Sequence, residues 1–102
     1  MSRKVAVVIY THVNFDGARV YRALGTAAEF ADQGDDVSIV FDGTGVETIA
    51  EISRDDHRMH GLLEKLRPNV RGVCGFCANS HRVADVVSAD GWKLLDEYKG
   101  HA

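Results

Sequence analysis

The sequence has 102 residues, of which 45% are hydrophobic and 26% charged, and its formal net charge is -3. This length fits a single domain spanning residues 1–102, and the composition is that of an ordinary globular protein. The 12 Lys and Arg and 15 Asp and Glu residues are spread along the chain without a basic cluster. The charge pattern therefore gives no indication of nucleic-acid or membrane binding.

The first third of the chain predicts a strand, a helix and a second strand. Residues 5–10 (VAVVIY) are a continuous apolar run rich in β-branched side chains, which is typical of a strand buried on both faces. Over residues 16–33 apolar side chains recur at helical spacing, with Asp16 as the expected cap and Gly34 as the expected stop. Residues 36–41 (DVSIVF) predict the second strand.

Helices and strands continue to alternate in the rest of the chain. A short helix is expected at 46–52. A second helix should begin at residue 55 or 56 and end at Pro68, because the apolar residues between them fall on one helical face. The remaining predictions are a strand at 70–73, a helix at 79–88 and a strand at 91–95.

This alternation predicts the fold class. Strands separated by helices favour right-handed crossovers and a mostly parallel sheet. We therefore expect a three-layer α/β/α sandwich with helices on both faces of a four- to five-stranded sheet. The apolar run at 5–10 is too short for a signal peptide, and no segment has the length of a transmembrane helix, so a cytoplasmic location is expected.

The only two cysteines of the chain lie close together in VRGVCGFCANSH, at Cys74 and Cys77. In a reducing compartment such a pair indicates redox, catalytic or metal chemistry more often than a structural disulfide. Cys74 ends the predicted third strand, and Cys77 lies where the next helix begins. Ligand sites form at this edge of a parallel sheet, and a helix N-terminus favours a thiolate.

Several interpretations of the cysteine pair remain open from the residues alone. His12 ends the first strand and would approach Cys74 if strands one and three were neighbours. Alternatively, Cys74, Cys77 and His81 form a C-x-x-C-x-x-x-H cluster that zinc accepts, with His12, His57 or His60 as a fourth ligand. The cysteines can also be simple core packing. Disulfide exchange is possible, but the motif does not follow an early strand as in a thioredoxin fold.

Nearly the whole chain resembles the DsrE-like family of small sulfur-relay proteins. The similar segments are the opening strand VAVVIYT, the segment RVYRALGTAAEFADQGDDVSIVFDGTG, the block DHRMHGLLEKLRPNVRGVCGFCA and the tail DGWKLLDEYKGH. The most specific feature is the cysteine after the third strand, which corresponds to Cys74. Relative to the relay subunits, Cys77 is an additional thiol, and the final helix and strand of the family are not recognisable here.

The resemblance implies a parallel α/β/α sandwich that assembles as a homo-oligomer, a trimer or a hexamer. It implies sulfur transfer, with a persulfide carried on Cys74, Cys77 as a second or resolving thiol, and donor and acceptor proteins as partners. His12 is the expected base. No cofactor is implied, whereas the alternative site of Cys74, Cys77 and His81 would hold zinc. We expect no nucleic-acid partner and no membrane association.

Overall fold

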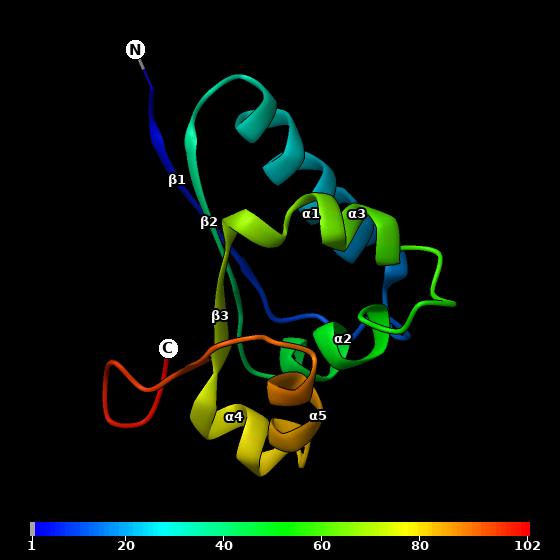
Figure 1. The fold of residues 1–102 in the computed structure, drawn as a ribbon, viewed down its shortest axis with the longest axis vertical. Helices are drawn as coiled ribbons and strands as arrows, with labels where there is room; N and C mark the ends of the chain where they lie inside the picture. The colour runs from blue at the N-terminus through cyan, green and yellow to red at the C-terminus, as the bar shows by residue number, and fades with distance from the viewer. Residues whose placement is uncertain (1) are drawn as a thin grey trace.

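The protein is described by a computed structural model covering residues 2–102. Strands and helices alternate along the chain (Figure 1). The strands are β1 (Lys4–Ile9), β2 (Asp36–Phe41), β3 (Val70–Cys74) and β4 (Leu94–Leu95). The helices are α1 (Gly17–Asp32), α2 (Gly45–Ile52), α3 (His60–Lys65), the 3-10 turn η1 (Arg67–Asn69), α4 (Gly75–Ser80) and α5 (Ala84–Ala89).

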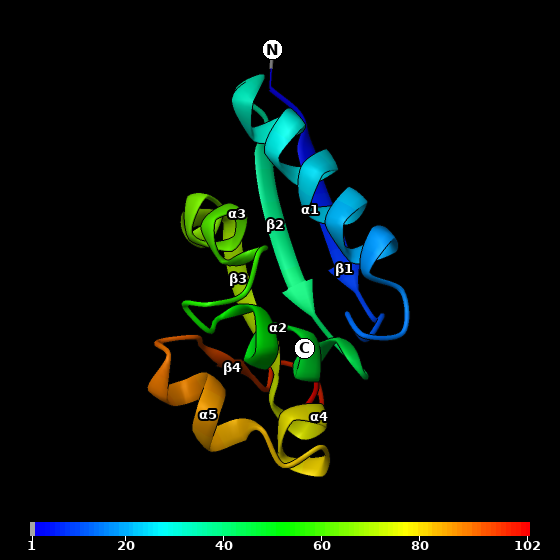
Figure 2. The same cartoon turned by 90° about the vertical axis from the view of Figure 1, so that its right-hand side faces the viewer.

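The four strands form one parallel sheet in the order β1-β2-β3-β4. The predicted α/β fold with a parallel sheet flanked by helices is therefore confirmed. Each crossover moves to the next strand in the same direction, and right-handed crossovers of this kind place their helices on the same face. Figures 1 and 2 show α1, α2, α3 and α5 together on one side of the strands. The arrangement is compatible with a three-layer α/β/α sandwich. The described residues form the sheet and the helical layer on one of its faces.

The burial of β1 follows from this arrangement. Ile9 is buried, whereas Val8, its neighbour, points to the other face and is 43% exposed. The prediction that this strand is buried on both faces is thus wrong for the described chain. In β2 the same alternation buries Val37, Ile39 and Phe41 against the helices.

The core lies between the sheet and the helical layer. Helix α1 contributes Val20, Leu24 and Ala27, and α2 contributes Val46, Ile49 and Ile52, all without exposed surface. Asp16 caps α1 as predicted, because its carboxylate accepts a hydrogen bond from the Arg19 amide at 3.0 Å.

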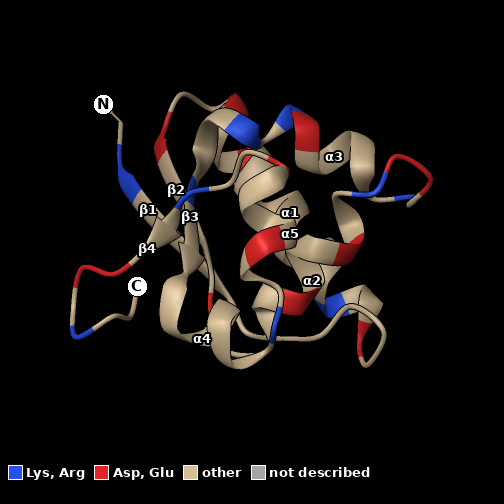
Figure 3. Ribbon diagram, turned by 60° about the horizontal axis from the view of Figure 1, so that its bottom comes forward, with Lys and Arg blue, Asp and Glu red and all other residues tan. Residues whose placement is uncertain are grey.

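Lys, Arg, Asp and Glu are interspersed along the ribbon in Figure 3. Within residues 2–102, none of the helices has the length and hydrophobicity needed to cross a bilayer.

The segment after β3 differs from its prediction. Instead of one helix at 79–88, two short helices flank a break at Arg82, whose φ of 62° is left-handed. The Val83 amide donates to the Ala78 carbonyl at 2.9 Å and the Arg82 amide to the Asn79 carbonyl at 3.1 Å. These two bonds form the usual C-terminal motif of a helix, which ends α4 here without the glycine that normally signals it.

The predicted strand at 91–95 is shorter in the structure, because only Leu94 and Leu95 pair with β3. Trp92 is instead held beside the helical layer. Its indole nitrogen donates to Ser53 Oγ at 2.8 Å, and the Arg67 guanidinium lies 3.8 Å from the centre of its ring. The chain then turns back, so that Gly100 and His101 lie against the start of α4.

Candidate functional site

Cys74 and Cys77 lie at the junction of β3 and α4, as predicted. Cys74 is the last residue of β3 and has no exposed surface, whereas Cys77 is half-buried in the first turn of α4. A glycine must separate them at position 75, because a Cβ there would lie 2.9 Å from the Leu95 carbonyl oxygen of β4. This close approach seats the start of α4, and with it Cys77, directly over the end of the sheet.

His101 completes a cluster with the two cysteines. Its Nδ1 lies 3.7 Å from Cys74 Sγ, although 27 residues separate them in the chain. The Phe76 amide donates to the Gly100 carbonyl at 2.9 Å, and the rings of Phe76 and His101 stack with centroids 4.4 Å apart. The backbone bond and the ring contact hold the imidazole in place against α4.

The turn after β2 forms the other wall of the cluster. Cys77 Sγ donates to Asp42 Oδ1 at 3.5 Å, and the same carboxylate oxygen accepts from the Gly43 amide at 2.7 Å. Asp42 is the first residue after β2, in the turn that leads into α2. Its carboxylate is therefore an oxygen group beside Cys77, supplied by the turn after the neighbouring strand.

Burial raises the pKa of the Cys77 thiol to about 11, and the neighbouring Cys74 adds to the effect. The Gly43 amide, which donates toward the sulfur, lowers the pKa by a smaller amount. For Cys77 this pKa shift is opposite in direction to the thiolate that a helix N-terminus favours, because burial disfavours the charged form.

The ligand atoms of Cys74, Cys77 and His101 all lie within 4.8 Å of one another. Two sulfurs and an imidazole nitrogen at such separations are a donor set that zinc accepts in tetrahedral geometry, with a fourth position left for another ligand. The cluster is thus compatible with a Cys-Cys-His site. The histidine that lies beside the cysteines is His101, whereas the sequence pattern pointed to His81.

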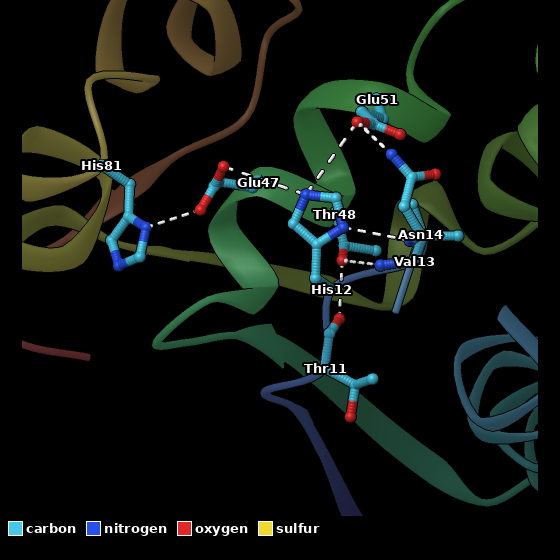
Figure 4. A network of polar contacts seen from close by, with 8 residues as sticks. All are labelled: Thr11, His12, Val13, Asn14, Glu47, Thr48, Glu51 and His81. Atoms are coloured by element: carbon cyan, nitrogen blue, oxygen red, sulfur yellow. Dashed lines mark hydrogen bonds and ion pairs between the residues drawn. The ribbon is translucent and has the colours of Figure 1, made fainter. Parts of the chain in front are cut away.

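His81 instead contacts Glu47 of α2. Its Nδ1 lies 2.7 Å from Glu47 Oε2, and Figure 4 shows Glu47 between His81 and His12. The proposed alternatives for a fourth ligand are also engaged locally: His57 accepts from the Met59 amide at 3.1 Å, and His60 Nδ1 lies 3.4 Å from the Ile52 carbonyl.

His12 belongs to the same network as His81. Strand β2 lies between β1 and β3, so the condition for an approach of His12 to Cys74 is not met. The ring accepts from the Asn14 amide at Nδ1 (3.0 Å), and its Nε2 lies 3.8 Å from Glu47 and 3.9 Å from Glu51. Because Nδ1 is the acceptor, Nε2 carries the proton of the neutral ring and faces the two carboxylates.

The loop that carries His12 is fixed by one buried polar side chain. Thr48 Oγ1 accepts from the Val13 amide at 2.9 Å and donates to the Thr11 carbonyl at 2.6 Å. Thr48 has no exposed surface, so these bonds satisfy backbone groups that water does not reach. Figure 4 shows how this pair of bonds ties the end of β1 to α2.

His101 is the residue that sequence reasoning missed. It lies in the C-terminal tail, where Lys99 and Gly100 both have left-handed backbone conformations and form a tight turn. The Lys-Gly pair before His101 was the available signal for that turn.

Comparisons with protein-family models, with curated proteins and with solved structures found no match to this chain.

Proposed function

We propose that the protein is a metal-binding module that holds zinc, or another thiophilic divalent ion, through Cys74, Cys77 and His101. The observation that carries the proposal is the convergence of their three ligand atoms, all within 4.8 Å, from β3, α4 and the C-terminal turn. Soft thiolates and imidazole select zinc over harder ions such as Mg²⁺ and Ca²⁺. A solvent molecule supplies the fourth ligand.

The raised pKa of the Cys77 thiol supports a metal more than a free nucleophile. A thiol with a pKa of about 11 is almost entirely protonated near pH 7 and is a poor nucleophile. A bound divalent ion reverses this, because it stabilises the thiolate and displaces the proton. Cys74 has no exposed surface, which also suits a ligand better than a group that must attack an external substrate.

The test uses zinc affinity and the spectrum of the cobalt-substituted protein. Purified protein should bind one equivalent of Zn²⁺, and Co²⁺ should give the intense thiolate charge-transfer and d–d absorption of a tetrahedral sulfur site. Cys74→Ser and Cys77→Ser should abolish both. Cobalt spectra without thiolate bands in the wild type would refute the assignment.

The second candidate function is sulfur transfer of the DsrE type, and the proximity of the two sulfurs favours it. In the first step a donor persulfide gives its outer sulfur to a cysteine thiolate, and the donor leaves as a thiol. The adjacent cysteine then attacks the persulfide, which forms the Cys74–Cys77 disulfide and releases sulfide. Cys74 is the acceptor that the family resemblance implies, but Cys77 is the sulfur with exposed surface.

The two candidates are separated by intact mass spectrometry of the reduced, metal-free protein after brief exposure to polysulfide. Sulfur transfer predicts adducts of one sulfur mass in Cys74→Ser or Cys77→Ser, where the resolving step is blocked, and a disulfide in the wild type. The metal module predicts that saturating Zn²⁺ suppresses any such adduct. The absence of sulfur adducts in both single-cysteine variants would exclude sulfur transfer at this site.

A further inference from the structure

A separate pocket of about 390 Å³ opens at the end of β1, away from the cysteines. It is lined by Tyr10, Thr11, His12, Phe15, Arg19 and Thr44. We propose that this pocket binds a small organic anion with a planar ring, such as an aryl carboxylate or an aryl phosphate. The proposal is independent of the metal site and of its function.

Arg19 provides the charge that an anion needs. It is the charged residue of the lining, and its side chain is 69% exposed. Its Nε lies 3.5 Å from the Asp16 carboxylate, which fixes the side chain on the first turn of α1. Within residues 2–102, the terminal guanidinium nitrogens make no hydrogen bond, so their donors remain available for a carboxylate or phosphate.

Two hydroxyl groups in the lining add neutral donors. Thr44 precedes α2, but its side chain does not cap the helix. Thr11 uses its carbonyl oxygen to accept from Thr48, and its own hydroxyl extends away from that bond (Figure 4). In the described chain neither hydroxyl has a protein partner, so both can donate to an oxygen of the ligand.

Two exposed aromatic side chains provide a surface on which a planar ring of the ligand can stack. Phe15 is 85% exposed and Tyr10 is 60% exposed, although both belong to residue types that usually bury much of their surface. Both line the pocket, and in the chain they lie on either side of His12 in sequence. An aromatic ligand that stacks on them would remove apolar surface from water on both partners.

The position of His12 gives the pocket a fixed wall. Asn14, Glu47 and Glu51 contact its two ring nitrogens, as Figure 4 shows, so the orientation of the ring is set by protein groups. The nearby carboxylates are engaged as well, since Glu51 accepts from Asn14 at 2.9 Å and Glu47 contacts His81. They are not among the lining residues, and Arg19, which is paired with Asp16, is the charged residue that lines the pocket.

The experiment is a titration of the full chain with benzoate and with phenyl phosphate, followed by amide chemical shifts. Shifts should concentrate at Tyr10, Thr11, Arg19 and Thr44, and uncharged benzamide should bind at least about tenfold more weakly. Loss of a charge-assisted hydrogen bond predicts that Arg19→Gln weakens binding of the preferred anion by about tenfold or more. Arg22→Gln, which removes the same charge from an exposed position on α1, is the matched control and should leave binding unchanged.

A second variant tests the aromatic contribution without risk to the fold. Phe15→Ala removes an exposed side chain, so it should weaken binding several-fold while the amide spectrum of the rest of the protein is retained. Stronger binding of one of the two anions identifies the preferred head group. Equal binding of benzamide, equal affinity in Arg19→Gln, or inorganic phosphate binding as tightly as phenyl phosphate would overturn the proposal.

Discussion

Cys74 Sγ and His101 Nδ1 lie 3.7 Å apart, and this contact joins the end of the sheet to the last turn of the described chain. If the pair shares a metal ion, His101→Gln should lower zinc affinity by at least about tenfold, because one of three protein ligands is lost. Competition with a zinc chelator measures the affinity. His81→Gln is the matched control, since His81 contacts Glu47 and lies outside the cluster, and its affinity should match the wild type. If His81→Gln lowered zinc affinity and His101→Gln did not, the result would favour Cys74, Cys77 and His81, the set predicted from sequence spacing.

The raised pKa of Cys77 predicts how the stability of the metal-free protein depends on pH. The folded state holds this thiol neutral up to about pH 11, whereas the unfolded chain ionises it near its usual value. The stabilising effect is therefore fully present below the pKa of the unfolded state and is lost as pH rises toward about 11. Urea denaturation of the reduced protein between pH 8 and about 11 should show this decline, and Cys77→Ser should show a smaller one. An equal decline in both proteins would contradict the assignment.

The protonation of Cys77 also makes zinc affinity depend on pH. Zinc affinity should rise with pH, whereas the stability of the metal-free protein should fall. Each thiol that loses a proton on binding should strengthen zinc affinity by about tenfold per pH unit below its pKa. Zinc affinity measured from pH 6 to 8 should therefore rise steeply in the wild type and less steeply in Cys77→Ser. Affinity that stays constant over this range would mean that the thiols are not ligands.

Gly75→Ala should destabilise the fold. The added Cβ would lie 2.9 Å from the Leu95 carbonyl oxygen, so β4 or α4 must shift, at a cost of about 1–3 kcal/mol. Gly61→Ala is the control, because Gly61 lies in α3 with nothing near its Cβ position. This second change should be neutral or stabilising by up to about 1 kcal/mol. Urea denaturation measures both, and a Gly75→Ala protein as stable as Gly61→Ala would show that α4 is not seated against β4.

Thr48→Val should also destabilise the protein, by about 1–3 kcal/mol. The substitution keeps the side-chain shape but removes the hydroxyl, so the buried Val13 amide and the Thr11 carbonyl both lose a partner. Thr26→Val, on the exposed face of α1, is the matched control and should change stability by less than about 0.5 kcal/mol. Equal unfolding midpoints for the two variants would show that water satisfies these backbone groups.

The order of helices and strands was largely predictable from the sequence, because its signals are local. The β-branched runs of β1 and β2 and the helical periodicity of α1 each lie within one element, as does the Asp16 cap. The break at Arg82 was not predictable, since arginine gives no local signal for a left-handed backbone. The exposed face of β1 was missed because it depends on which side of the sheet every crossover takes.

The candidate site could be predicted only in part, because some of its contacts join segments that are far apart in the sequence. Cys74 and Cys77 are three positions apart, so their proximity follows from the chain itself. The approach of His101 to Cys74 requires β4 to pair beside β3 and the tail to turn back at Gly100. The separation of His12 from Cys74 depends on the strand order, which places β2 between them. Neither relation is encoded in residue spacing.

X-ray absorption of the zinc-loaded protein is the decisive experiment for the metal site, because it identifies the atoms bound to the metal. A site of Cys74, Cys77 and His101 should show two sulfur ligands at about 2.3 Å and nitrogen or oxygen ligands at about 2.0–2.1 Å, with both sulfurs lost in the Cys74→Ser, Cys77→Ser double variant. A spectrum of nitrogen and oxygen ligands alone, in the wild-type protein carrying one equivalent of zinc, would contradict it.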